Sequence, residues 1–359
     1  MSSKYRLSMR IGALLAVASL ALTACGGETP EPGATPDATD TATTGDTAAP
    51  PAEDLTITFI PKQLNNPYTD VVLGGGEAGA EEAGFVEANV VGPLDASASS
   101  QVSFINAETQ AGTNVIVIAA NDPDAVCSAL EEARAGGAKI VAFDSDANPD
   151  CRDVFVSQVV AEDVAKIQVE MIAEQIGGEG DIAILSATAN ATNQNEWIKF
   201  MEEELASNPD YADINLVAKV YGDDDDTKSF QEAQGLLQAH PDLKGIISPT
   251  TVGIAATARY LSTSEYKGKV ALTGLGLPNE MRSFVKDGTV TEFALWDPAQ
   301  LGYVSAYAGM ALATGEMTGA VGDKFTAGEM GEREVGENSV IIVGPPVRFN
   351  ADNIDDYDF

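Results

Sequence analysis

The chain reads Leu55-Thr56-Ile57-Thr58-Phe59-Ile60 and, shortly after, Asn66-Pro67, a strand pattern followed by the start of a helix. β-Branched and aromatic residues favour a buried strand. Asparagine before proline is typical of an N-cap followed by the first helical position, and Gly84 is a suitable stop for that helix. A strand that leads into a helix is the repeating unit of parallel sheets.

The same alternation continues along the chain. In a first series, strands are predicted near 86–92, 114–119 and 139–144, with helices near 98–111 and 122–135. A second series is predicted as helix 161–176, strand 181–186, helix 194–206, strand 214–220, helix 228–239, strand 244–248, helix 253–262, strand 269–274, helix 279–287, strand 290–295, helix 299–313 and strand 339–343. This pattern indicates an α/β protein with parallel sheets and helices on both faces. Two series without a low-complexity linker between them predict two lobes.

The first 54 residues predict export rather than a folded domain. A basic start and a short apolar run indicate a signal peptide over 1–24. Leu22-Thr23-Ala24-Cys25 resembles the bacterial lipoprotein cleavage box, which implies that Cys25 carries lipid at the outer face of the cell membrane. An ordinary secreted protein is the alternative. Residues 25–54 have too few large apolar residues to form a core, which predicts a disordered linker and a membrane contact through the lipid only.

The charge of the chain narrows its possible partners. Its formal net charge is −35, and it becomes −38 when the three cations of the signal peptide are removed. Such a surface argues against nucleic acid and anionic lipid as partners, and it disfavours anionic substrates. A neutral or cationic small molecule is the easier ligand.

Polar side chains follow several of the predicted strands. In open parallel sheets, ligands bind beyond the carboxyl ends of the strands, so these residues are candidates for one site. The candidates are Lys62, Asn121, Asp144, Asp146, Asn193, Gln194, Pro249, Thr251, Trp296 and Asp297. Amides, carboxylates and a lysine can bond to adjacent hydroxyls, which favours a neutral, polyhydroxylated ligand. Loop capping is the alternative interpretation, and for Asn121 it is equally well supported.

Aromatic side chains near the same strand ends are candidates for stacking on a sugar ring. These residues are Trp296, Tyr68, Trp197 and Phe59. Core packing is the alternative for all of them, and it is the stronger interpretation for Phe59.

Several motifs between Leu55 and Phe359 carry a family resemblance. They are Phe59-Ile60-Pro61-Lys62-Gln63-Leu64-Asn65-Asn66-Pro67-Tyr68, Phe143-Asp144-Ser145-Asp146, Asn193-Gln194-Asn195-Glu196-Trp197, Tyr221-Gly222-Asp223-Asp224-Asp225-Asp226, Ile247-Ser248-Pro249-Thr250-Thr251-Val252-Gly253 and Phe293-Ala294-Leu295-Trp296-Asp297-Pro298. Together they resemble sugar-binding proteins of ABC importers, most closely the rhamnose-binding type and its autoinducer-2-binding relatives.

The resemblance implies the type I periplasmic-binding-protein fold. This fold has two Rossmann-like lobes, joined by a hinge of three crossings, with the ligand between them. The expected lobes are residues 55–157 with about 290–325, and about 158–289 with 326–359.

The resemblance also suggests individual ligand-binding residues. Four positions match residues of the autoinducer-2 branch, namely Lys62, Asp144, Gln194 and Pro249. The chain departs from that branch at Asn193, where the branch has aspartate, and at Thr251, where it has alanine. The first change removes a charge and the second narrows the pocket, so both favour a deoxysugar such as rhamnose.

Cys127 and Cys151 remain after the lipidation cysteine. An even pair outside the cytoplasm predicts a disulfide, with two free thiols as the alternative. The family resemblance implies the same pairing.

Other chemistry has weaker support. The single histidine, His240, follows a predicted helix, so no nucleophile–histidine pair is indicated. A glycosidase needs two carboxylates, which Asp144 and Asp297 would supply. The run Asp223 to Asp226 could bind calcium, but a solvated strand-to-helix connection is the stronger interpretation. Gly74-Gly75-Gly76 indicates close helix packing.

The sequence therefore predicts the solute-binding protein of an ABC importer. It would capture a neutral monosaccharide, rhamnose first, by closure of its lobes and deliver it to the membrane permease. No cofactor and no metal are expected. The alternatives are a receptor for autoinducer-2 or a related signal, and an exported carbohydrate-cleaving enzyme.

Overall fold

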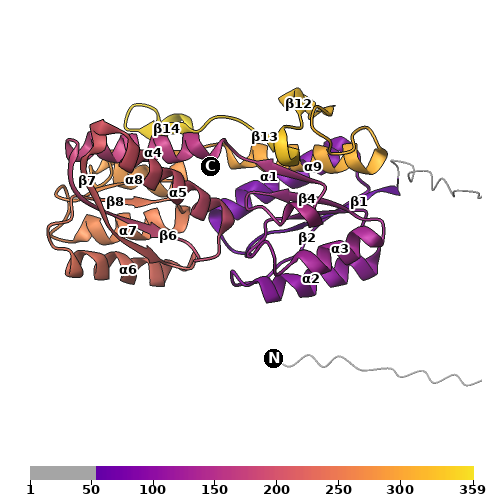
Figure 1. The fold of residues 1–359 in the computed structure, drawn as a ribbon, viewed down its shortest axis with the longest axis horizontal. Coiled ribbons are helices and arrows are strands. Elements are labelled where there is room, and N and C mark those ends of the chain that lie inside the picture. Colours follow the sequence, from indigo (N-terminus) through magenta and orange to yellow (C-terminus); the bar gives the residue numbers. More distant parts are fainter. Residues whose placement is uncertain (1–53) are drawn as a thin grey trace, which may run out of the picture. The chain divides into compact units, whose positions relative to one another are not determined.

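The computed structural model describes residues 54–359, which form two α/β lobes (Figure 1). The first lobe is built on a six-stranded sheet in the order β13-β5-β4-β3-β1-β2, in which every pairing is parallel. Its strands are β1 (Thr56–Ile60), β2 (Glu87–Val90), β3 (Val115–Ile118), β4 (Lys139–Phe143), β5 (Val154–Ser157) and β13 (Val340–Ile342). All residues of β3 are buried, as expected for a parallel strand covered on both faces.

Helices cover both faces of this sheet. Figure 1 shows α1 (Pro67–Ala83) and α9 (Pro298–Thr314) on one face, and α2 (Ala98–Ala111) and α3 (Cys127–Ala135) on the other. The predicted start of α1 is confirmed, because the Asn66 side chain accepts hydrogen bonds from the amides of Tyr68 and Thr69. Its predicted end is confirmed as well, since Gly84 adopts the left-handed conformation with φ 95°.

The second lobe repeats this architecture on a smaller sheet in the order β7-β6-β8-β9. Its strands are β6 (Glu179–Ser186), β7 (Asp213–Tyr221), β8 (Gly245–Ser248) and β9 (Ala271–Gly274). A ribbon of β10 (Glu292–Leu295) and β14 (Val347–Asn350) lies beside β9, joined to it by the bridge between Leu275 and Ala294. The helices are α4 (Ala161–Ile176), α5 (Thr192–Ser207), α6 (Asp226–Ala239), α7 (Thr251–Thr263) and α8 (Pro278–Lys286).

Short elements complete the described chain. A hairpin of β11 (Lys324–Thr326) and β12 (Glu332–Glu334) packs on the first lobe through Phe325 and Val335. Single turns of 3₁₀ helix occur at Pro149–Cys151, Pro209–Tyr211, Gly328–Met330, Glu337–Ser339 and Ile354–Asp356.

The chain passes between the lobes after β5, after β10 and after β13. Strand pairing corrects two of the predicted lobe boundaries. β10 falls in the stretch expected in the first lobe, but it pairs with β14 in the second lobe. β13 falls in the stretch expected in the second lobe, but it pairs with β5 in the first lobe. The first lobe therefore takes up the chain from α9 to β13.

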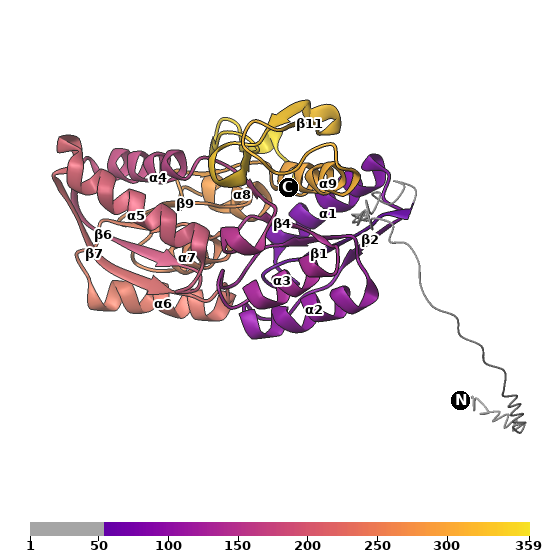
Figure 2. The same ribbon diagram turned by 45° about the vertical axis from the view of Figure 1, so that its right-hand side comes forward.

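Glycines allow α1 and α9 to lie side by side (Figure 2). A Cβ atom at Gly75 would lie 2.0 Å from the carbonyl oxygen of Ala299, and one at Gly302 would lie 1.9 Å from that of Val72. The prediction that Gly74-Gly75-Gly76 serves close helix packing is confirmed for Gly75 and Gly76, whereas Gly74 has open space around it.

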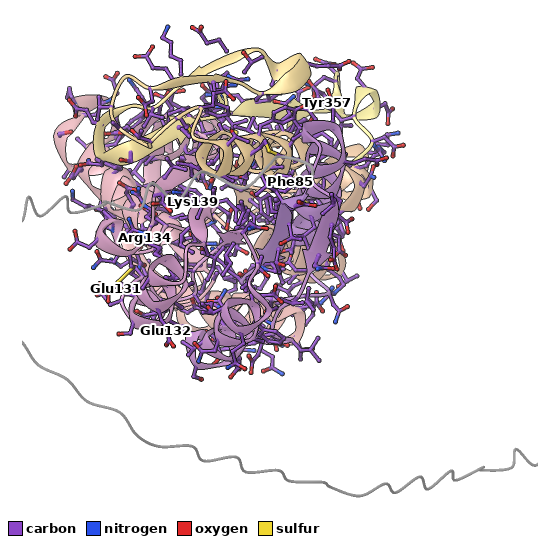
Figure 3. The ribbon with its side chains drawn as sticks, turned by 90° about the vertical axis from the view of Figure 1, so that its right-hand side faces the viewer. Phe85, Glu131, Glu132, Arg134, Lys139 and Tyr357 are labelled. Atoms are coloured by element: carbon purple, nitrogen blue, oxygen red, sulfur yellow. A yellow bond between two sulfur atoms is a disulfide. The ribbon has the colours of Figure 1, made fainter. Side chains whose placement is uncertain are left out.

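A disulfide joins Cys127, at the start of α3, to Cys151, with 5.4 Å between the two Cα atoms. It ties the outer helix layer of the first lobe to the segment that follows β4. Figure 3 shows this end of the lobe, where Glu131, Glu132 and Arg134 of α3 lie at the surface. Arg134 reinforces the same connection by donating to the carbonyl oxygen of Asp150 at 2.8 Å.

The predicted signal peptide over 1–24, lipidation at Cys25 and nearly all of the linker over 25–54 lie outside the described residues. Among residues 54–359, no helix is long and apolar enough to cross a membrane.

Candidate functional site

A cavity lies between the lobes, where the carboxyl ends of both sheets face each other. Nine of the residues predicted from the sequence line it: Lys62, Tyr68, Asp144, Asn193, Gln194, Trp197, Pro249, Thr251 and Trp296. Seven further residues line the cavity but are not among the predicted site residues, although Gln63 and Thr250 follow predicted strands: Gln63, Asn66, Thr69, Asp224, Thr250, Leu275 and Leu295. Most of these seven also follow or end a strand, so the strand-end rule could have found them.

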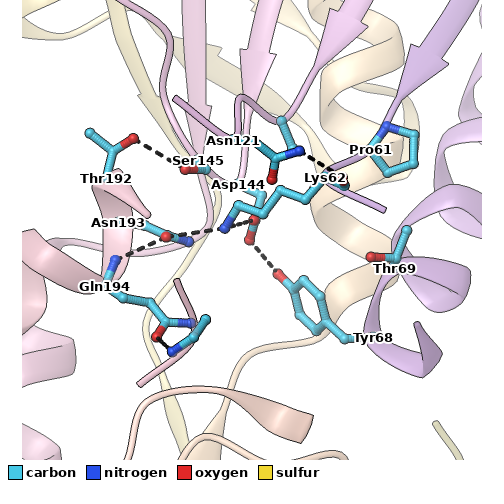
Figure 4. Close-up of polar contacts among 12 residues, drawn as sticks. Pro61, Lys62, Tyr68, Thr69, Asn121, Asp144, Ser145, Thr192, Asn193 and Gln194 are labelled. Atoms are coloured by element: carbon cyan, nitrogen blue, oxygen red, sulfur yellow. Dashed lines mark hydrogen bonds and ion pairs between the residues drawn. The ribbon is translucent and has the colours of Figure 1, made fainter. Parts of the chain in front are cut away.

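An ion pair between Lys62 and Asp144 forms the first-lobe side of this cavity (Figure 4). The Lys62 ammonium lies 3.2 Å from Oδ2 of Asp144 and also donates to Oδ1 of Asn193, in the second lobe, at 3.2 Å. Asp144 adopts a left-handed backbone conformation with φ 58°, which is unfavourable for a residue with a side chain. This turn aims the carboxylate into the cavity instead of continuing strand β4.

Tyr68 and Trp296 connect this ion pair to the second lobe. The Trp296 indole donates to the Tyr68 hydroxyl at 3.0 Å, and that hydroxyl donates to Oδ1 of Asp144 at 3.0 Å. Burial, and then the negative charge of Asp144, raise the pKa of Tyr68 well above its ordinary value. Tyr68 therefore stays protonated and remains a hydrogen-bond donor near neutral pH.

The start of α5 contributes two amide side chains from the second lobe. Oε1 of Gln194 accepts from the Ser186 hydroxyl at 2.5 Å and from the Ala187 amide at 2.8 Å. Because the oxygen is occupied, the orientation of the Gln194 amide is fixed and its NH₂ group is left for the cavity. Asn193 is held in a similar way, since its Oδ1 accepts from the Gln194 backbone amide at 2.9 Å.

Apolar side chains close the remaining wall. Leu275 and Leu295, at the ends of β9 and β10, are 2% and 0% exposed and line the cavity together with Pro249. Trp197 packs edge-on against Trp296, with 5.9 Å between the ring centroids. The cavity therefore combines hydrogen-bonding groups with a distinct apolar surface.

Four predicted site residues lie outside the cavity. Asn121 donates to the Lys62 carbonyl oxygen at 2.8 Å, so it supports the loop that carries Lys62. Asp146 turns away and forms a two-pronged ion pair with the buried Arg152, at 2.6 and 2.9 Å. Asp297 caps α9 by accepting from the Ala299 amide at 3.0 Å. Phe59 is fully buried in the core of the first lobe against Phe143, which confirms the stronger of its two interpretations, core packing, and removes it from the candidates for ring stacking.

Among the residues that the structure describes, neither the single histidine nor a cluster of possible metal ligands contributes to the cavity. His240 lies at the C-terminal end of α6. Within residues 54–359, no group of three or more histidine, cysteine, aspartate or glutamate side chains could hold a metal ion.

Several hydrogen bonds join the lobes around the cavity. Besides the contact from Lys62 to Asn193, the Gln63 amide donates to the Asp224 carbonyl oxygen at 3.2 Å. The hydroxyls of Ser145 and Thr192 lie 3.2 Å apart. These contacts place the described lobes in a closed arrangement.

Comparison with known proteins supports a common ancestry for the whole described chain. The periplasmic binding protein domain family is matched over residues 57–317. A crystal structure of a sugar ABC transporter protein from Actinomyces odontolyticus is 73% identical in sequence, with 85% of this chain and 98% of that one covered and a TM-score of 0.70.

Two more distant structures carry ligands. An ABC transporter solute-binding protein from Clostridium phytofermentas with bound L-rhamnose is 36% identical, with 85% of this chain and 98% of that one covered and a TM-score of 0.81. LsrB from Clostridium saccharobutylicum in complex with AI-2 is 29% identical, with 85% of this chain and 100% of that one covered and a TM-score of 0.79.

Proposed function

Since this chain belongs to the periplasmic binding protein family, we propose that it captures rhamnose, a neutral deoxysugar, for a sugar ABC importer. Its relatives are described as proteins of sugar import, among them binding proteins for D-apiose and for ribose, and they are not enzymes. The choice of rhamnose rests on one observation, the likeness of the described fold to that of the relative with bound L-rhamnose, at 36% identity and a TM-score of 0.81.

The polar side of the cavity supports a neutral, hydroxylated ligand. Asp144, Asn193 and Gln194 offer acceptors and donors whose orientations are fixed by other protein groups. A site of this kind discriminates well, because a missing hydroxyl leaves a buried partner unpaired at about 1–3 kcal/mol. Lys62 is the single cation among the lining residues and is already paired with Asp144, which disfavours an anionic sugar.

The apolar side of the cavity supports a deoxysugar. Leu275, Leu295 and Pro249 present no hydrogen-bonding side-chain group. The methyl group of a 6-deoxysugar is stabilised by such a surface at about 0.8 kcal/mol per buried carbon, whereas a hydroxymethyl group there lacks a partner.

Lobe closure is the mechanism we propose for capture. The structure with 73% identity superimposes less well than the rhamnose-bound structure with 36% identity, although both comparisons cover 85% of this chain. A lower TM-score for the more similar sequence is expected when rigid lobes turn about a hinge and the two structures differ in how far the lobes are closed. The better match to the rhamnose-bound structure then supports a nearly closed position for the present lobes. A sugar that bonds to both lobes favours closure through its higher affinity for the closed state.

The alternative ligand is autoinducer-2 or a related signal. The LsrB complex favours it, as do the cavity positions of Lys62, Asp144, Gln194 and Pro249. Asn193 and Thr251, where this chain departs from the autoinducer-2 branch, also line the cavity and favour the sugar.

Calorimetry with three matched sugars tests the proposal. L-Lyxose lacks the methyl carbon of L-rhamnose, and L-mannose adds a hydroxyl to it. We expect rhamnose to bind tightest, with lyxose weaker by about fourfold for one lost apolar carbon and mannose by about tenfold or more for an unpaired hydroxyl. Equal binding of the three sugars, or tighter binding of autoinducer-2, would contradict the assignment. Chromatography of a rhamnoside after incubation would detect the hydrolysis expected of an enzyme.

We also propose that Cys25 anchors the mature protein by lipid beside its permease. The family works in the periplasm or outside the cell, and the cleavage box supports lipidation. A Cys25→Ala variant should appear in the culture medium while the parent protein stays with the membrane fraction. Retention of both proteins at the membrane would argue against the anchor.

A further inference from the structure

The turn between β7 and α6 contains four consecutive aspartates, Asp223 to Asp226, and three of them have clear structural partners. Asp225 caps α6 by accepting from the Lys228 amide at 2.7 Å. Asp223 forms an exposed ion pair with the Lys228 ammonium. Asp226 holds Arg259 of α7 through two bonds, at 2.7 and 2.8 Å. These contacts account for three of the four charges in the run.

Asp224 differs from its neighbours because it lines the cavity between the lobes. Its Oδ1 accepts a hydrogen bond from the Thr250 hydroxyl, and its Oδ2 accepts none from the residues that the structure describes. Within the same residues, no lysine or arginine nitrogen lies within 4.0 Å of its carboxylate. Asp224 is thus a partly buried carboxylate of the cavity lining, with one oxygen that accepts no hydrogen bond from the described residues.

The backbone around Asp224 supports a role in binding. Asp223 and Asp224 both adopt left-handed conformations, with φ 54° and 51°. Two successive residues of this kind are unfavourable, and such strain concentrates at ligand sites. The Asp224 carbonyl oxygen also accepts the bond from Gln63 of the first lobe, so this turn is a place where the lobes meet.

The charges in the cavity indicate what Asp224 would bind. Lys62 is paired with Asp144, so Asp224 has no cation of its own there. Burial is the main reason why the pKa of Asp224 is raised, while the nearby positive charge of Lys62 opposes that shift. A ligand that supplies a hydrogen-bond donor would stabilise the ionised carboxylate.

We propose that Asp224 is the specificity-determining carboxylate of the second lobe and accepts a hydrogen bond from a sugar hydroxyl. This inference rests on the proposed function, since it assigns a role to a residue of the same site. Asp224 selects sugars that carry a hydroxyl or an ammonium group at the position it contacts, and it excludes sugars that carry a carboxylate there. The interpretation of the whole run as a solvated connection therefore holds for its other members only.

The test compares Asp224→Asn with Asp223→Asn. Asparagine tolerates left-handed conformations and keeps an oxygen for Thr250, so the first change removes mainly the charge. The second change removes a charge from the adjacent, exposed position. We expect Asp224→Asn to weaken rhamnose binding by about 10- to 100-fold in calorimetry, while Asp223→Asn stays within about twofold of the parent.

Deoxyfluoro sugars distinguish direct contact from an indirect effect. Fluorine replaces a hydroxyl without donating a hydrogen bond. We expect one member of the 2-, 3- and 4-deoxyfluoro rhamnose series to bind the parent protein about tenfold more weakly than rhamnose. The Asp224→Asn variant should bind the same analogue less than about threefold more weakly than it binds rhamnose. The reason is that the acceptor left without a donor is no longer charged.

Each outcome decides between the two proposals. Two results would overturn the role of Asp224 and leave the sugar-binding function standing. One is unchanged rhamnose affinity in Asp224→Asn. The other is that each fluorinated analogue loses the same affinity relative to rhamnose in the parent protein and in Asp224→Asn. If the parent protein binds no sugar, the function itself fails and this inference fails with it. If the parent binds a different neutral sugar, the fluorinated series of that sugar replaces the rhamnose series.

Discussion

Lys62 and Asp144 neutralise each other before any ligand enters the cavity. Their charged groups lie 3.2 Å apart, and their side chains are only 14% and 11% exposed. Tyr68 donates a further hydrogen bond to the carboxylate. A sugar therefore meets a carboxylate whose position is fixed and which still has acceptor capacity, since two oxygens can accept about four bonds.

The first prediction concerns Asp144→Asn. Asparagine fits the left-handed backbone but removes the charge that holds Lys62 and Tyr68. We expect rhamnose affinity to fall by at least about tenfold, because hydrogen bonds to a charged group contribute about 1.5–3 kcal/mol. The melting temperature of the sugar-free protein, measured by differential scanning calorimetry, should fall less than in Asp146→Asn, because Lys62 is more exposed than Arg152 and keeps its hydrogen bond to Asn193. A variant with normal affinity would remove Asp144 from the site.

The second prediction is the opposite pattern for Asp146→Asn. This substitution leaves the Arg152 side chain, 2% exposed, without its ionic partner. We expect the free energy of unfolding to fall by about 2 kcal/mol in urea denaturation, since an unpaired buried charge is costly and Asp146 itself is partly exposed. Rhamnose affinity should stay near the parent value. A loss of affinity without a loss of stability would place Asp146 in the site after all.

At this scale the sequence predicts which residues lie near the cavity but not how every side chain is oriented. The strand-end rule fixes where a Cα atom lies, and it succeeded for Lys62 and Asn193. It misplaced Asp146, whose direction depends on Arg152, a partner six residues away that no strand-end pattern identifies. It overlooked Asp224 because a run of four identical charges gives no local sign of which one faces inward.

Among the elements, α1 and α9 depend on close backbone contact. They begin 231 residues apart in the sequence, at Pro67 and Pro298, yet their glycines meet in the first lobe. The apolar composition of the segment 299–313 predicted a buried helix, and α9 is buried along most of its length. The pairing of α9 with α1 could not be inferred from the sequence, because the glycine run in α1 does not indicate which helix packs against it.

The third prediction contrasts Gly75→Ala with Gly74→Ala. The new methyl group at position 75 would lie 2.0 Å from a backbone oxygen of α9, which cannot move away without separating the helices. We expect a loss of at least about 3 kcal/mol in the free energy of unfolding. At position 74 nothing lies within 4 Å, so alanine should stabilise α1 by about 0.5–1 kcal/mol. Equal effects in chemical denaturation would contradict this packing.

Most elements follow from local sequence, and the exceptions have a physical reason. Helix 161–176 agrees with α4 to the residue, because its apolar spacing and its terminal glycine are both clear. β5 and β14, of four residues each, were not predicted. Such short strands are stabilised by their neighbours in the sheet, and neighbouring strands are not adjacent in the sequence.

At the scale of the whole molecule, the fourth prediction concerns closure. The bonds from Lys62 to Asn193 and from Gln63 to Asp224 cross the cleft and must break when the lobes separate. Solution X-ray scattering should therefore give a smaller radius of gyration with saturating rhamnose than without sugar. A Thr192→Val variant loses the contact with Ser145 and should need more sugar for the same change. An unchanged radius in the presence of bound rhamnose would contradict a hinge mechanism.

Strands β13 and β14 lie late in the sequence, and each pairs with a strand made earlier, β13 in the first lobe and β14 in the second. Their position determines when each lobe can be completed during synthesis. The edge strand of the first sheet ends at Ile342, and the strand that completes the second lobe ends at Asn350. The six-stranded sheet of the first lobe and the β10–β14 ribbon of the second lobe therefore both wait for strands that are synthesised late. Neither lobe can therefore reach its final packing until the segment 340–350 has been synthesised, so both lobes are completed late in folding.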